Sequence, residues 1–97
     1  MTDAASPRLT LLARAYCHLC DDMLAALRPL SLAHRAPVDV VDVDAEANAA
    51  LEARWGELVP VLFLGPPAEG GALCHYHLDG AAVEVALRKF ASPPEIG

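Results

Sequence analysis

Apolar residues recur along the chain in short runs that have the period and length of strands. Residues 8–15 and 59–64 are compact apolar runs, and residues 37–44 are rich in valine and partly alternate with aspartate. Short apolar runs and period-two alternation are typical of strands in a partly buried sheet. Pro60 lies at the start of its run, where a strand tolerates proline. The pattern therefore predicts three strands over these ranges.

The segment between the first two runs has the period of a helix. In residues 17–28 the apolar side chains fall on one helical face, formed by Leu19, Met23, Leu24 and Leu27. Asp21 and Asp22 are expected in the first turn, where carboxylates suit the helix dipole. Pro29 is expected to end or kink this helix, because proline lacks the backbone N–H that a helix interior needs.

Two further helices are predicted, over residues 45–54 and 80–90. Asp44 is a good N-cap for the first, and Gly56 is a plausible stop at its other end. Asp79 is placed to cap the second, since its carboxylate can accept a hydrogen bond from a free N–H of the first turn.

The loop chemistry of residues 65–71 predicts a turn into a fourth strand over residues 72–78. The order is then β-α-β-α-β-β-α. A helical crossover makes the first two strands parallel, and the short loop makes the last two antiparallel. We therefore expect an α/β fold with a mixed four-stranded sheet flanked by helices. It forms one domain over residues 8–91, with flexible termini at 1–7 and 92–97.

Composition limits the classes of function. The chain has 97 residues, of which 55% are hydrophobic, enough for a single small core. Its net charge of −6 and seven scattered basic residues argue against nucleic acid and anionic membranes as partners. No apolar run approaches the roughly 20 residues of a membrane span. The first residues lack a basic opening, and Arg14 interrupts their apolar stretch, so we expect no signal peptide and a cytoplasmic protein.

Three cysteines carry the candidate chemistry: Cys17, Cys20 and Cys74. An odd count in a cytosolic chain argues against a structural disulfide framework. Cys17 follows a predicted strand and opens a predicted helix, whose N-terminal dipole and free N–H groups stabilise a thiolate. In such settings cysteine pKa values fall from about 8.5 to about 3.5–7.5. The spacing places Cys20 one turn below, shielded, so Cys17 is expected to attack a disulfide and Cys20 to resolve the mixed intermediate.

The neighbours of the pair act in opposite directions. Protonated His18 would favour the Cys17 thiolate, whereas Asp21 and Asp22 disfavour a second negative charge, so the reduction potential stays open. Half a zinc site and two inert buried thiols remain as alternative interpretations of the pair.

The chain resembles the glutaredoxin-like branch of the thioredoxin superfamily, and in particular the small bacterial glutaredoxin-like proteins. The matching residues span 9–90 in the family's order: Tyr16-Cys17-His18-Leu19-Cys20, Val41-Asp42-Val43-Asp44, Val59-Pro60-Val61-Leu62 and His77-Leu78-Asp79. The resemblance implies a thioredoxin-like fold and a small thiol–disulfide oxidoreductase acting on protein or small-molecule disulfides. Such an oxidoreductase requires no cofactor, and glutathione or a thioredoxin reductase system is the candidate reductant.

The resemblance also implies roles for residues around the dithiol. It implies that the Val59–Pro60 peptide bond is cis and faces the dithiol, and that the backbone of Val59 pairs with the substrate. Arg14 stands where glutaredoxins carry a basic residue near the glycyl carboxylate of glutathione. Glutaredoxins bind the γ-glutamyl end of glutathione at the start of their last helix, and Asp79 is the one residue of this chain that matches that site. Tyr16 flanks the nucleophile and either shapes the groove or simply packs.

The remaining candidates have plainer interpretations. We expect Cys74 to be a small buried hydrophobe rather than a zinc ligand with His77, because strand residues three apart point to opposite faces. His75 and His77 are expected to share one face of the fourth strand. Trp55 is expected to pack the end of its helix. The alternative function is a thioredoxin-fold binding module, or a metal or iron–sulfur carrier, without redox turnover.

Overall fold

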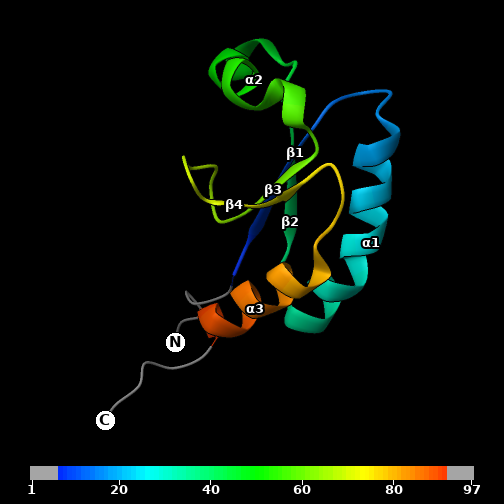
Figure 1. Ribbon diagram of the computed structural model, residues 1–97, viewed down its shortest axis with the longest axis vertical. Helices are drawn as coiled ribbons and strands as arrows, with labels where there is room; N and C mark the ends of the chain where they lie inside the picture. Colours follow the sequence, from blue (N-terminus) through cyan, green and yellow to red (C-terminus); the bar gives the residue numbers. More distant parts are fainter. Residues whose placement is uncertain (1–6, 92–97) are drawn as a thin grey trace.

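The sheet is built around β1 (Leu9–Ala13), in which all five residues are buried. β2 (Val38–Asp42) pairs with it in parallel, and β3 (Val61–Leu64) pairs with its other edge in antiparallel fashion. β4 (Ala72–His75) completes the order β2-β1-β3-β4 by pairing antiparallel with β3. The computed structural model describes residues 7–91 and confirms the predicted element order and mixed four-stranded sheet (Figure 1).

Helices cover both faces of this sheet. The side chains of α1 (His18–His34) and α3 (Gly80–Ala91) pack on one face, in a cluster with Leu9, Leu11 and Leu62. On the other face α2 (Ala49–Trp55) lies at the end of the sheet where β1 ends (Figure 1). Its Trp55 belongs to a second cluster with Leu12 and Phe63. The two faces of β1 thus serve two separate clusters, as strand alternation requires.

α1 runs through Pro29 to His34, so the expectation that proline ends it is wrong. The period of its apolar face continues, because Leu27 is fully buried and Leu30 packs against the same cluster. Packing of this face offsets the hydrogen bond that proline cannot make. The helix ends at His34, and its C-cap Arg35 adopts a left-handed conformation (φ 53°) and donates its N–H to the Leu32 carbonyl.

The second helix begins later than predicted. A short 3₁₀ turn, η1 (Glu46–Asn48), precedes α2, and no side chain caps either element, so Asp44 is not an N-cap. Gly56 follows the last residue of α2, but its φ of −54° lets the chain continue into a second 3₁₀ turn, η2 (Gly56–Leu58). The helix therefore tightens before it ends.

The Asp79 cap of α3 is confirmed, since its Oδ1 accepts a hydrogen bond from the Ala82 N–H (3.1 Å). β4 ends at His75, because the next residue, Tyr76, takes a left-handed conformation with φ 65°. His77 therefore lies outside the strand, and the prediction that His75 and His77 share one strand face is wrong.

The predicted flexible termini fall mainly on residues 1–6 and 92–97, which lie outside the described residues; Pro7, which is described, is buried. Across residues 7–91, none of the helices combines the length and apolar character needed to cross a bilayer.

Candidate active site

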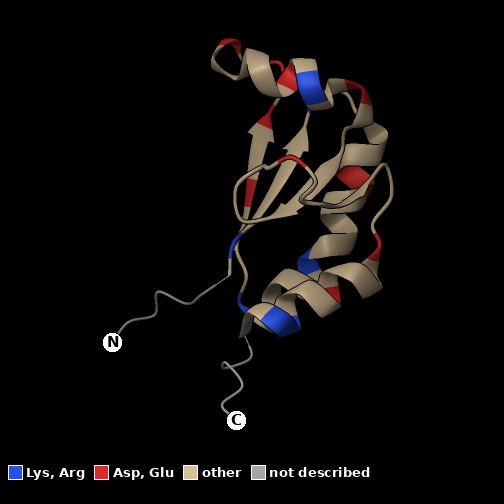
Figure 2. Cartoon of the chain, turned by 60° about the vertical axis from the view of Figure 1, so that its left-hand side comes forward, with Lys and Arg blue, Asp and Glu red and all other residues tan. Residues whose placement is uncertain are grey.

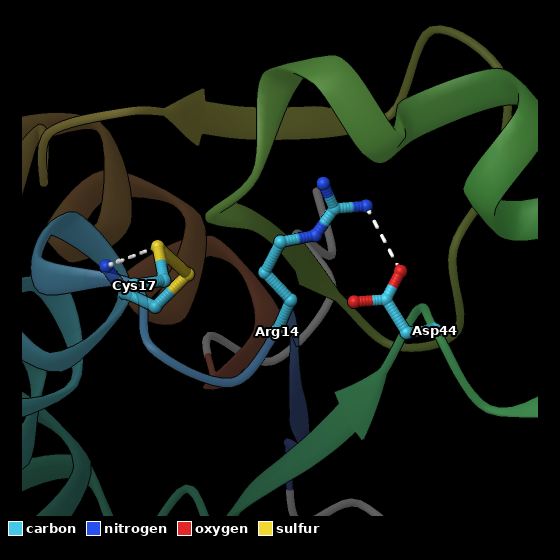
Figure 3. Close-up of a disulfide and its surroundings, with 4 residues drawn as sticks. Arg14, Cys17 and Asp44 are labelled. Carbon is cyan, nitrogen blue, oxygen red and sulfur yellow. Dashed lines mark hydrogen bonds and ion pairs between the residues drawn. A yellow bond between two sulfur atoms is a disulfide. The ribbon is translucent and has the colours of Figure 1, made fainter.

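Cys17 and Cys20 form a disulfide at the N-terminus of α1 (Figure 3). Cys17 is the N-cap residue, with extended backbone dihedrals, and the two Cα atoms are 5.2 Å apart. Cys20 is only 4% exposed, whereas Cys17 is half-buried. Cys17 is thus the more exposed residue of the pair, and the order of attack expected from the spacing stays a prediction.

The backbone of α1 supplies a hydrogen bond to the outer sulfur. The Cys20 N–H donates to Cys17 Sγ over 3.1 Å. This N–H is one of the free donors of the first helical turn, so its hydrogen bond and the helix dipole both favour negative charge on Cys17. Of the two carboxylates expected in this turn, the structure places Asp21 there and Asp22 one residue beyond it; both are exposed, as is His18.

The segment that precedes β3 packs beside the dithiol. Val59 and Cys20 belong to one buried cluster, against which Cys17 also packs. The Val59–Pro60 peptide bond is cis. The Pro60 carbonyl accepts a hydrogen bond from the Tyr76 N–H (2.9 Å), so the segment after β4 is fastened to the same loop. The structure thus brings Val59, the residue before the cis bond, together with the two cysteines, and Pro60 follows it as a buried residue.

Arg14 leaves β1 beside the dithiol and is held by two carboxylates. Its Nη2 lies 3.1 Å from Asp44 Oδ1 and 3.3 Å from Glu52 Oε2 (Figure 3 draws the first pair). Among the described residues, Arg14 Nε is a buried side-chain nitrogen without a hydrogen-bond partner. Gly56 lies against this pair, because a Cβ there would come 2.6 Å from Glu52 Oε2.

The two acidic partners of Arg14 were not predicted from the sequence. One signal was available, since Arg14 follows β1 and Asp44 follows β2, and the ends of neighbouring parallel strands meet at one edge of the sheet. Glu52 comes from α2, and no local pattern points from it to Arg14. That Arg14 binds the glycyl carboxylate of glutathione stays a prediction.

Tyr16 and Asp79 lie in different surroundings. The Tyr16 side chain is fully exposed and its φ is 57°, so packing, one of its two expected roles, is excluded. It precedes Cys17 in the chain, and its role in shaping the groove stays a prediction. The Asp79 carboxylate is engaged as the α3 cap, and the Asp79 backbone hydrogen-bonds the Cys74 thiol rather than either cysteine of the dithiol.

Trp55 and Cys74 each pack in one of the two hydrophobic clusters. Trp55 is 6% exposed and meets the Phe63 ring edge-on, with 5.1 Å between centroids, which confirms its packing role. Cys74 is half-buried against the α1–α3 cluster, and burial raises the pKa of its thiol. No group of three or more metal-ligating side chains gathers anywhere in residues 7–91. Cys74 and His77 therefore do not join the dithiol in a four-ligand site.

Comparisons with known proteins place this geometry in a family. Residues 8–88 match the model of the glutaredoxin-like domain (DUF836). The solution structure of protein Ne2328 from Nitrosomonas europaea is 31% identical, with a TM-score of 0.71 over 89% of this chain and 96% of that one. The X-ray structure of XcR50 from X. campestris is 34% identical, with a TM-score of 0.57 over 88% and 99%.

More distant structures share the fold alone. Thioredoxin O1 from Arabidopsis thaliana, in its oxidised state, is 16% identical, with a TM-score of 0.59 over 91% of this chain and 80% of that one. A search of curated proteins gives no match. The fold is thus thioredoxin-like, as expected from the sequence. The match over residues 8–88 shows that the chain belongs to the glutaredoxin-like domain family.

Proposed function

We propose that this protein is a small thiol–disulfide oxidoreductase in which Cys17 is the nucleophile and Cys20 the resolving thiol. The observation that carries the proposal is the position of Cys17. Its sulfur caps α1, accepts the Cys20 N–H, and lies within bonding reach of a cysteine that is buried. A nucleophilic thiol needs stabilised negative charge and access, and a resolving thiol needs proximity and shielding.

The reaction proceeds in two exchanges. The Cys17 thiolate attacks one sulfur of a substrate disulfide, forms a mixed disulfide, and releases the other substrate sulfur as a thiolate that takes up a proton. The Cys20 thiol then loses its proton and attacks Cys17 Sγ, which forms the Cys17–Cys20 disulfide and releases the second substrate thiol. Two electrons pass from the dithiol to the substrate.

The partners follow from this chemistry and from the family. The substrates are protein or small-molecule disulfides, with the Val59 backbone and the exposed Tyr16 flanking the reacting sulfur. No metal or organic cofactor enters the exchange. A cycle needs a thiol donor, for which glutathione and a thioredoxin reductase system are the candidates, and the reducing cytoplasm is the compartment that supplies either.

A redox titration tests the proposal. The purified protein is equilibrated in glutathione buffers of graded poise, quenched with an alkylating agent, and weighed intact to count thiols, internal disulfide and glutathione adducts. A reversible Cys17–Cys20 disulfide is expected, with Cys20→Ser accumulating a mixed disulfide on Cys17 and Cys74→Ser behaving as the parent. Disulfide exchange that survives Cys17→Ser would refute the assignment.

Native mass spectrometry of the freshly reduced protein addresses the metal-carrier alternative. Under the proposal the mass equals that of the metal-free chain with both thiols intact. A stoichiometric mass increase that disappears in Cys17→Ser would favour the carrier.

A further inference from the structure

Cys20, the inner cysteine of the dithiol, lines an apolar groove that the proposed exchange reaction does not use. The groove has a volume of about 280 Å³ and lies between α1 and β2, which is one of the two edge strands of the sheet. Its apolar lining includes Leu11, Leu24 and Val40, together with Cys20. Val40 is 53% exposed although it is a large apolar side chain on a strand. The floor therefore offers contact area that nothing in the described chain covers.

The rim of the groove is acidic. Asp21 and Asp42 line it from α1 and from the end of β2, and both are exposed. Arg14 is the cation among the lining residues, but Asp44 and Glu52 already hold its guanidinium. In Figure 2 acidic segments lie around the end of the molecule that carries α2, while most basic segments lie toward the opposite end, where α3 ends. An incoming group at the groove therefore meets net negative charge.

These two features select one kind of occupant. An apolar floor binds an apolar side chain, and a carboxylate rim attracts Lys or Arg beside it. We infer that the groove binds a segment of the substrate polypeptide that carries an apolar residue next to basic residues, so that cationic protein disulfides are the preferred substrates. This inference rests on the proposed thiol–disulfide exchange. Glutathione disulfide fits poorly, because it is anionic and has no large apolar side chain.

The test uses matched substrates of equal length. Each is a synthetic peptide with one cysteine capped by 2-mercaptoethanol as a mixed disulfide. The cysteine is flanked by Lys and Leu in the first peptide, by Glu and Leu in the second, and by Lys and Ala in the third. Pre-reduced protein is mixed with each in single-turnover experiments between 20 and 500 mM NaCl. Glutathione disulfide and the uncharged bis(2-hydroxyethyl) disulfide serve as small-molecule references.

The expected order of second-order rate constants follows from the groove. At low salt the Lys–Leu peptide should react at least about tenfold faster than the Glu–Leu peptide, because steering by charge commonly gives about 10–10³-fold. Salt should shrink this gap, since it screens exposed charges. The smaller gap between the Lys–Leu and Lys–Ala peptides should persist at high salt, because it arises from apolar contact.

Matched variants identify the residues that cause each difference in rate constant. Asp21→Asn should reduce the ratio of Lys–Leu to Glu–Leu rates. Asp39→Asn should leave this ratio unchanged, because it makes the same charge change on β2, farther from the dithiol. Val40→Ser should reduce the ratio of Lys–Leu to Lys–Ala rates. Val85→Ser is its control, because Val85 is 52% exposed on α3 and outside the groove. A ratio of two substrates cancels any change in thiolate reactivity.

The outcomes separate the two proposals. No exchange with any disulfide, the uncharged one included, would overturn the proposed function. Exchange at equal rates with all three peptides, or ratios that Asp21→Asn and Val40→Ser leave unchanged, would overturn the groove inference while the oxidoreductase stands.

Discussion

Reduction of the Cys17–Cys20 disulfide should lower the free energy of unfolding by an amount that depends on pH. The disulfide joins cysteines three positions apart, so it closes a loop of four residues. The chain-entropy relation gives about 1.9 kcal/mol for a loop of this size at 25 °C. In a domain of this length that corresponds to a fall in Tm of about 8–15 °C on reduction. This full difference is expected at pH values below the pKa of the Cys17 thiol in the folded protein, where ionisation adds nothing to the stability of the reduced form.

The difference should shrink as pH rises, because the N-terminus of α1 stabilises a thiolate on Cys17 only in the folded protein. Reduced folded protein then binds fewer protons than reduced unfolded protein, so its stability rises with pH. The added stability is complete above about pH 8.5, where an ordinary cysteine has ionised, and is lost as pH falls. A pKa lowered by one unit corresponds to about 1.4 kcal/mol, so a Cys17 pKa of about 7.5 or below predicts a shrinkage of at least about 1 kcal/mol between pH 5 and pH 9.

The assay is urea unfolding of the oxidised and reduced protein, followed by far-ultraviolet circular dichroism at pH 5, 7 and 9. Cys74, whose pKa burial raises, is present in both forms and cancels in the difference. The double variant Cys17→Ser, Cys20→Ser should not respond to reductant. If the free energies of unfolding of the oxidised and reduced protein differ by the same amount at pH 5 and at pH 9, the claim that α1 activates Cys17 is refuted.

Three further predictions follow from single contacts. Because burial raises the pKa of Cys74, iodoacetamide at pH 8 should alkylate it more slowly in the folded protein than in urea, by intact mass, and equal rates would contradict this. Trp55→Ala should lower the free energy of unfolding by about 3–5 kcal/mol in urea titration, and a loss below about 1 kcal/mol would show that the ring is dispensable. Asp79→Ala should cost about 0.5–2 kcal/mol by the same measurement, because the Ala82 N–H loses its acceptor, whereas Asp79→Asn should retain most of the stability.

Local patterns predicted the elements because the period of each apolar run matches the strand or helix that buries it. The strand signal of residues 8–15 contains β1, and the cap at Asp79 depends on residues three apart in the chain. The end of α1 was missed because Pro29 is a strong local signal that packing overrides. Leu27 before the proline and Leu30 after it belong to one face that packs on the same cluster, and their contacts come from other elements.

The dithiol was predictable for the same local reason, whereas its electrostatic surroundings were not. Cys17, Cys20 and the helix they open are adjacent in sequence. Asp44 was expected to cap a helix, but a cation 30 residues earlier binds its carboxylate. A carboxylate next to an N-terminal turn satisfies either role, and only the register of β1 on β2 decides between them.

Because Asp44 and Glu52 pair with Arg14, we expect the reactivity of Cys17 and the preference for charged substrates to depend on different groups. Both pairs are partly exposed, so each contributes only about 0.2–1 kcal/mol, and the packing of Trp55 rather than the pairs holds α2 on the sheet. Their larger effect is on the local field, because a cation beside the dithiol is neutralised by Asp44 and Glu52. Stabilisation of a Cys17 thiolate then rests on the N–H groups of α1, which act at hydrogen-bond distance. The carboxylates act over a longer range on whatever approaches, and salt should weaken their influence without slowing exchange with an uncharged disulfide.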